Sequence, residues 1–94
     1  MNPENGGRIE LRLGEATSEA AEYEAHLKTP SGSFRGRAKV GSQVVFDAWS
    51  GDGADPPSWL VEDARAALKA ALRTNQAEGR WPRRITRWRP EPER

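Results

Sequence analysis

The chain has 94 residues, a formal net charge of +1 and no cysteine. This length predicts a single domain with one small core, and the lack of cysteine excludes disulfides, thiolate zinc sites and a cysteine nucleophile. The first residues have no apolar signal-peptide core, and no stretch approaches the length of an apolar membrane span. We therefore expect a cytoplasmic protein with no membrane association.

Alternating side chains predict the first three strands. Residues 8–14 (RIELRLG) place apolar and charged side chains on opposite sides, as a half-buried strand does. Residues 21–28 and 34–40 have the same period of two, although the alanines and glutamates of the first segment favour helix by propensity. Pro30 and Gly32, which suit a tight turn, lie between these two segments.

Charge and hydropathy together predict the register of this hairpin. A loop over residues 29–32 sets Leu27 opposite Phe34 and Glu24 opposite Arg37. A shift by one residue would mix the apolar and polar faces, and a shift by two would place like charges opposite each other. Both criteria therefore select the same pairing.

A fourth strand over residues 43–49 is predicted next, with Val45, Asp47 and Trp49 on the face away from the core. A helix over residues 58–76 follows a loop, and Asp55 or Ser58 is its expected cap. Its apolar stripe consists of Leu60, Val61, Ala64, Ala67, Leu68, Ala71 and Leu72. The charged residues expected to face solvent are Arg65, Lys69 and Arg73.

Residues 80–89 (RWPRRITRWR) combine arginines with large apolar side chains. Trp81, Ile85 and Trp88 have the i, i+4, i+7 spacing of a helical stripe, but isoleucine, threonine and tryptophan favour extended backbone. Helix and extended chain both remain open, and we favour an extended strap or a short edge strand. All three apolar residues are expected to close the core, because their burial is strongly favourable.

The predicted fold is α+β: a four-stranded antiparallel meander with one helix on one face (β-β-β-β-α), then the strap. One domain over residues 8–89 is expected, between disordered ends at 1–7 and 90–94. As topology alone, the element order of residues 8–76 resembles a single repeat of the PUR and whirly single-stranded nucleic-acid-binding folds. That resemblance implies a homodimer that binds on the open face of its sheet.

Motifs for catalysis are absent from the sequence. His26 is the only histidine, and no sequence argument places a nucleophile beside it. Asp52 and Asp55 are oxygen ligands that a magnesium ion accepts, but turn formation and helix capping account for both. We therefore expect no enzymatic activity, no cofactor and no metal.

Basic residues suggest a binding function. Residues 80–94 have six basic and two acidic side chains, a net charge of +4, and a row of cations follows the third strand close to Trp49. Basic residues beside an exposed aromatic ring form a platform on which single strands stack. The candidate nucleic-acid-binding residues are Arg35, Arg37, Lys39, Trp49, Arg80, Arg83, Arg84, Arg87 and Arg89.

Two alternatives qualify this prediction. Glu22 and Glu24 lie across the hairpin from the cationic row, and such cross-strand pairs commonly serve stability alone. The second alternative is a protein-interaction module, an inhibitor or accessory subunit, that docks a partner on the open sheet face or on an edge strand. The leading hypothesis is weak, sequence-tolerant binding of single-stranded nucleic acid.

Overall fold

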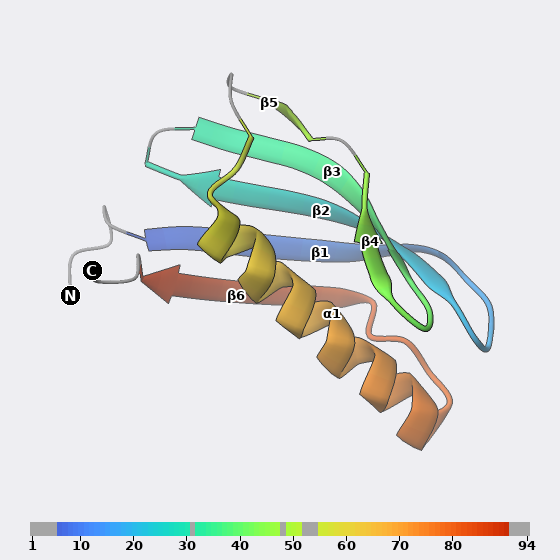
Figure 1. The fold of residues 1–94 in the computed structure, drawn as a ribbon. Coiled ribbons are helices and arrows are strands. Elements are labelled where there is room, and N and C mark those ends of the chain that lie inside the picture. The colour runs from blue at the N-terminus through green and yellow to red at the C-terminus, as the bar shows by residue number, and fades with distance from the viewer. Residues whose placement is uncertain (1–5, 31, 48, 52–54, 91–94) are drawn as a thin grey trace.

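The computed structural model describes residues 6–30, 32–47, 49–51 and 55–90. Its elements are β1 (Gly6–Ala16), β2 (Ala21–Thr29), β3 (Gly32–Val40), β4 (Val44–Phe46), β5 (Ser50–Gly51), α1 (Ser58–Glu78) and β6 (Arg84–Pro90). The strands form one antiparallel sheet in the order β4-β3-β2-β1-β6, and β5 pairs with β3 (Figure 1).

The α+β class with an antiparallel sheet and one helix is confirmed, but the sheet has six strands instead of four. The strap over residues 80–89 contains the additional edge strand β6, which pairs with β1. The predicted fourth strand is shorter, because regular pairing of β4 ends at Phe46, and β5 follows separately. The predicted disordered ends also need correction, because β1 begins at Gly6 and β6 ends at Pro90. Residues 1–5 and 91–94 lie outside the described residues.

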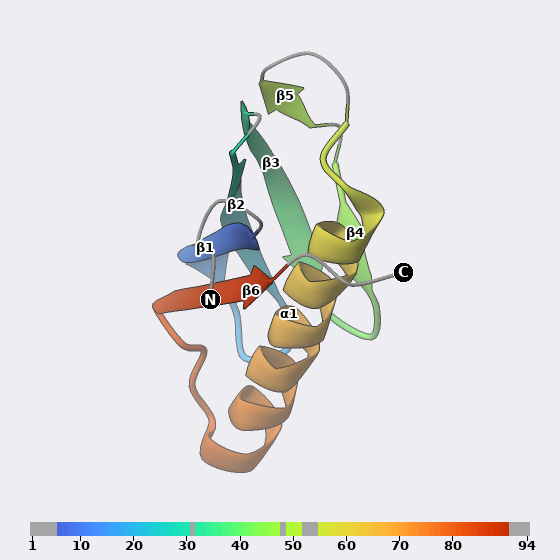
Figure 2. The same ribbon diagram turned by 90° about the vertical axis from the view of Figure 1, so that its left-hand side faces the viewer.

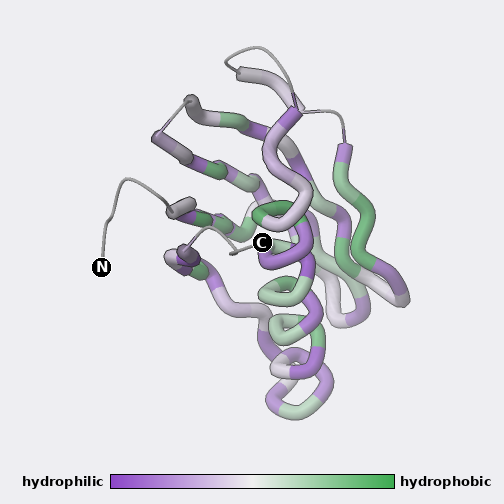
Figure 3. The backbone as a smooth tube through the Cα atoms, turned by 60° about the vertical axis from the view of Figure 1, so that its left-hand side comes forward, coloured by the Kyte–Doolittle hydropathy of each residue, from purple (hydrophilic) through white to green (hydrophobic). Residues whose placement is uncertain are grey.

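The β2–β3 register matches the predicted pairs, but the predicted loop over residues 29–32 is shorter, because Thr29 and Gly32 pair within the strands. Leu27 pairs with Phe34, and Glu24 pairs with Arg37. The nearest ion pair of this hairpin is diagonal, because Arg37 Nη1 lies 3.7 Å from Glu22 Oε1. Period-two alternation, visible as changing colour along the strands in Figure 3, together with the charges of the paired residues, therefore fixes the pairing.

Helix α1 covers one face of the sheet, and no element of the described chain covers the other (Figure 2). Its predicted stripe is confirmed, with Leu60 and Leu68 fully buried against the strands. The helix approaches closely at Gly7, where a Cβ would lie 2.7 Å from Leu60 Cδ1. The predicted caps Asp55 and Ser58 are not used: the N-cap is Pro57 without a side-chain hydrogen bond. A left-handed Gly79 ends the helix.

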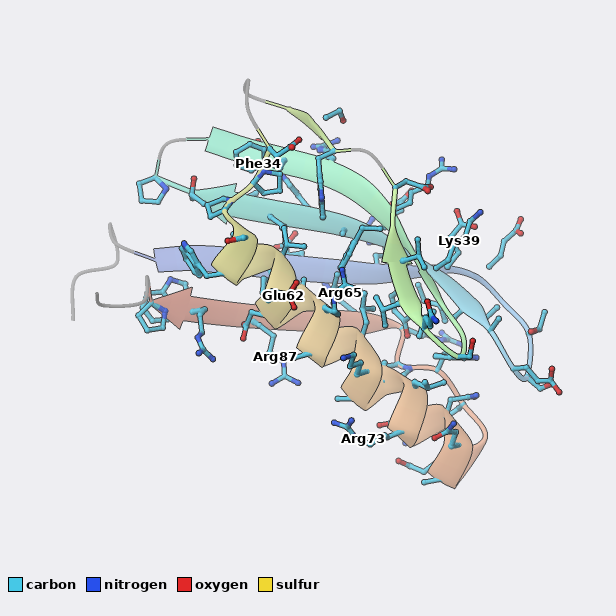
Figure 4. All side chains as sticks on the ribbon, in the orientation of Figure 1. Phe34, Lys39, Glu62, Arg65, Arg73 and Arg87 are labelled. Carbon is cyan, nitrogen blue, oxygen red and sulfur yellow. The ribbon has the colours of Figure 1, made fainter. Side chains whose placement is uncertain are left out.

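Arg65 is not a solvent-facing residue, in contrast to the prediction from the helical wheel. Its guanidinium donates a hydrogen bond from Nη1 to the carbonyl of Val44 and lies 5.2 Å from the ring centroid of Phe46. It also lies 3.6 Å from a carboxylate oxygen of Glu62. The side chain reaches from α1 to β4 (Figure 4) and ties the helix to the sheet edge. The expected exposure of Lys69 and Arg73 is confirmed.

The segment between α1 and β6 is anchored by Trp81, which is buried in the core as predicted. Its Nε1 donates to the carbonyl of Thr17 over 2.8 Å, and the hydroxyl of the fully buried Tyr23 donates to the carbonyl of Pro82. The side-chain amide of Asn75 donates from Nδ2 to the carbonyl of Ser18 over 2.9 Å. These bonds hold the β1–β2 turn against the C-terminal end of the helix.

Candidate nucleic-acid interface

The sheet face opposite α1, here called the open face, carries the side chains that alternate with the buried ones. Arg8, Glu10 and Arg12 come from β1, and Glu22, Glu24, His26 and Lys28 come from β2. The remaining members are Arg35, Arg37 and Lys39 of β3, Val45 of β4, and Arg84, Thr86 and Trp88 of β6.

The register arranges these side chains in rows that cross the strands. The first row runs Arg37, Glu24, Arg12 and Arg84 over four neighbouring strands. The second row runs Arg35, His26, Glu10 and Thr86. The third row runs Ser33, Lys28, Arg8 and Trp88. Residues of different strands that are far apart in sequence thus share one surface, because cross-strand neighbours have Cβ atoms about 5 Å apart.

A cavity of about 510 Å³ lies over the first two rows. Its lining includes the charged residues of both rows, with Asp47 and Ser50 on the β3 side. This volume is within the range of about 300–1,000 Å³ that is typical of small-molecule sites. The cavity is therefore large enough for one nucleotide of a nucleic-acid chain as well as for a free small molecule.

Cations outnumber carboxylates on the open face. Arg8, Arg12, Lys28, Arg35, Arg37, Lys39 and Arg84 supply seven positive charges. Glu10, Glu22, Glu24 and the neighbouring Asp47 supply four negative ones, which leaves a net charge of +3. Two of these cations form ion pairs: Arg8 with Glu10 at 3.0 Å and Arg37 with Glu22 at 3.7 Å. The other five form no ion pair with any described residue.

Trp88 completes the third row at the β6 edge and is 42% exposed. Sequence reasoning placed it in the core, which is wrong: Ile85 and Trp88 are three residues apart, so an extended backbone puts them on opposite faces. Ile85 packs against the core. The indole lies against Gly6, where a Cβ would overlap the ring. The absence of a side chain at that position gives the ring room to lie on the sheet.

Trp49 is not part of the open face, in contrast to the prediction. Its ring packs against the core side of the sheet, 5.3 Å from the ring of Phe46 between centroids. A Cβ on Gly36 would lie 2.8 Å from Trp49 Cε3. The reason is that the β4 strand ends at Phe46, so the alternation no longer assigns Trp49 to a face.

Arg87 and Arg89 also lie away from the open face. Arg87 pairs in the sheet with the fully buried Ile9, which places Arg87 on the helix side of β6 (Figure 4). Arg89 lies on the same side, and its Nη1 donates to Asp63 of α1 over 3.2 Å. These two arginines were predicted to bind nucleic acid, and the fold assigns Arg89 to an ion pair with the helix.

The other predicted tail arginines have separate positions. Arg80 is exposed beside the helix end and lies 3.3 Å from Glu78. Arg83 is exposed just before β6, and its carbonyl accepts a hydrogen bond from the amide of Leu13. Of the predicted tail residues, Arg84 alone joins Arg35, Arg37 and Lys39 on the open face.

Four cationic or aromatic residues of the open face were missing from the predicted site: Arg8, Arg12, Lys28 and Trp88. Alternation already placed the side chains of Arg8 and Arg12 away from the apolar face of the first strand. The sequence did not indicate that β1 is an inner strand between β2 and β6. Pairing with β6 adds Arg84 and Trp88 to the surface that the first three strands form.

His26 lies in the middle of the second row. Its Nε2 is buried and has no hydrogen-bond partner among the described residues. Burial lowers the pKa of the imidazole, and the positive charges of Lys28 and Arg35 lower it further, while Glu10 acts in the opposite direction. The ring is therefore neutral at pH 7, with one hydrogen-bonding nitrogen unused.

An NMR titration of His26 should show a midpoint below the ordinary value of about 6.5. Because the pKa of the folded state is lowered, the unfolded chain takes up the proton first as the pH falls. The free energy of unfolding should then decrease below about pH 6.5, down to the pKa of the folded state. His26→Gln should lose this part of the pH dependence. A midpoint at or above the ordinary value would contradict the burial argument.

Comparisons with protein-family models, with curated proteins and with solved structures found no match for this chain. The described residues contain no group of three or more His, Asp or Glu side chains placed to hold a metal ion. The one helix in the described ranges, α1, lacks the long apolar stretch that crossing a bilayer requires.

Proposed function

We propose that this protein is a non-enzymatic module that binds single-stranded nucleic acid on the open face. The observation that carries the proposal is the exposed indole of Trp88 in one row with Arg8 and Lys28. An aromatic face for stacking beside cations for phosphates is the combination that single-strand-binding surfaces use. The excess of cations over carboxylates on this face supports an anionic ligand.

The arrangement favours a single strand over a duplex. Stacking on Trp88 requires a base whose faces are free, and a paired duplex does not offer one within its length. The cations come from four strands and are spread over the whole face, so they meet a backbone that crosses the sheet. Contacts to phosphate position the ligand without reading its sequence.

A protein partner is the second candidate, and the open edge of β6 favours it. Among the described strands, β6 pairs on one side only, with β1. An extended segment of another protein can add to such an edge. A homodimer through this edge is disfavoured, because β6 contains three arginines, Arg84, Arg87 and Arg89, and no acidic residue.

Fluorescence anisotropy with a labelled, mixed-sequence single strand tests the proposal. We expect binding at micromolar protein in low salt. If the five cations outside ion pairs all meet phosphates, the slope of log affinity against log salt is about −3.5. Trp88→Ala should weaken binding by about 1–3 kcal/mol through lost stacking.

Trp88→Phe is the matched control, because it keeps an aromatic face at the same position. It should retain more of the affinity than Trp88→Ala, with both variants folded by circular dichroism. Undetectable binding of the unchanged protein at micromolar concentration in low salt would disprove the proposal and leave the protein partner as the better candidate.

A further inference from the structure

We infer that the open-face cavity receives a guanine base, read by Glu24 and Arg12. The inference rests on the proposed function in one respect: the base is expected to arrive as part of a single strand. The same chemistry would also accept the base of a free guanine nucleotide, and the test below separates the two sources.

Glu24 differs from the other carboxylates of β1 and β2 on the open face. Glu10 is engaged by Arg8 at 3.0 Å, and Glu22 is engaged by Arg37 at 3.7 Å. Glu24 lines the cavity and is exposed, and its carboxylate forms no hydrogen bond or ion pair with any residue that the structure describes. Its two oxygens are therefore available as acceptors to a ligand in the cavity.

Arg12 is the direct neighbour of Glu24 in the first row and also lines the cavity. It is exposed and forms no ion pair with a described residue. Arg84 continues the row on β6. The cavity thus offers a carboxylate next to a guanidinium, with a cross-strand separation of about 5 Å between their Cβ atoms, and a further cation at its rim.

Guanine is the base whose edge matches this pair. Its N1–H and N2–H₂ donate side by side, which suits the two oxygens of one carboxylate. Its O6 and N7 lie next to these donors and accept from arginine in the commonest base-specific contact. Adenine and cytosine each offer one amino group to the carboxylate, and uracil and thymine offer one ring N–H. Only guanine places two adjacent donors beside two acceptors.

The distance from the cavity to Trp88 fits a nucleic-acid chain that continues from the cavity to this indole. Thr86 ends the second row, and Trp88 lies two residues further along β6. Two residues of a strand separate their Cα atoms by about 7 Å. A base held over the first two rows thus leaves Trp88 free to stack a neighbouring base. The indole contributes affinity for any sequence, and Glu24 with Arg12 specifies one position.

The experiment measures binding by fluorescence anisotropy in low salt. It compares twelve-nucleotide oligothymidylates that carry one central dG, dA or dC with a pure oligothymidylate of the same length. The dG strand should bind between about fivefold and about a hundredfold more tightly than the others. Glu24→Gln should lose most of the preference for dG, because one amide cannot replace two carboxylate acceptors and only the contact from Arg12 remains. Glu22→Gln is the matched control: it removes the same charge from the same strand and should keep the preference.

Each outcome decides one of the two hypotheses. Equal affinity for all four strands overturns the guanine inference and leaves the proposed function standing. A preference for dG of unchanged size in Glu24→Gln also overturns the inference, because guanine is then read elsewhere. If no strand binds, the proposed function fails, and NMR titration with GMP and AMP tests the cavity directly. Larger shifts at Glu24 and His26 with GMP would then support a free nucleotide as the ligand, and equal or absent shifts would end the inference.

Discussion

Replacing Trp81 with alanine should lower the free energy of unfolding by about 3–5 kcal/mol. The side chain is only 8% exposed and belongs to the hydrophobic core. Its removal also leaves the carbonyl of Thr17 without the Nε1 donor 2.8 Å away. Urea unfolding measures the loss, and a variant already unfolded in water by circular dichroism meets the same expectation, because small domains have little stability in reserve.

Trp88→Ala is the matched control for this effect. It removes the same residue type only seven positions further along the chain, from a site that is 42% exposed. The loss of stability should be clearly smaller than for Trp81→Ala, while binding should suffer as described above. Equal losses of stability in the two variants would show that both indoles belong to the core and that the open face has no stacking platform.

Leu68→Ala should cost about 2–5 kcal/mol of unfolding free energy. Leu68 is fully buried at the centre of the helix–sheet interface, where the surrounding strands cannot collapse into the space left by its side chain. The exposed neighbour Lys69 provides the control, and Lys69→Ala should change stability by no more than about 0.5 kcal/mol. Similar urea midpoints for the two variants would contradict the assignment of the buried helix face.

Arg65 is unsuitable as such a control, although its helical position suggests a solvent-facing residue. Its guanidinium donates to the carbonyl of Val44 and packs over the ring of Phe46. Helical periodicity predicts on which side of the axis a side chain begins, but not how far a long side chain reaches. The position of β4 beside the helix determines that contact, and this position depends on tertiary structure.

Local patterns were sufficient for the elements whose partners are close in sequence. The β2–β3 register followed from period-two alternation and from the charges of Glu24 and Arg37. The helix stripe followed in the same way, and Leu60 and Leu68 are buried as expected. In these cases the residues that decide the structure are close together in the sequence, within one hairpin or one helix.

Long-range pairing was beyond those patterns, and it determines the candidate site. An extended strap or edge strand was predicted for residues 80–89, but its pairing with β1 was not, so Arg12 and Arg84 were not recognised as neighbours. Trp49 was misplaced because the alternation was extended past the end of β4. One signal was present in the sequence: Gly36 interrupts the apolar face of its strand, and a glycine there often marks the place where a large group packs.

The pairing of β1 with β6 also bears on how the chain folds. Gly6 pairs with Pro90, 84 positions later (90 minus 6), whereas the β1–β2 and β2–β3 pairs need only short loops. Contacts so distant in sequence slow folding, because the chain loses conformational entropy in closing the long loop before the contact can stabilise it. We therefore expect the hairpins to assemble first, which leaves one side of β1 with unpaired backbone groups until residues 84–90 pair with it. During that interval this edge is the place where another incompletely folded chain can add, so refolding yield should decline as protein concentration rises.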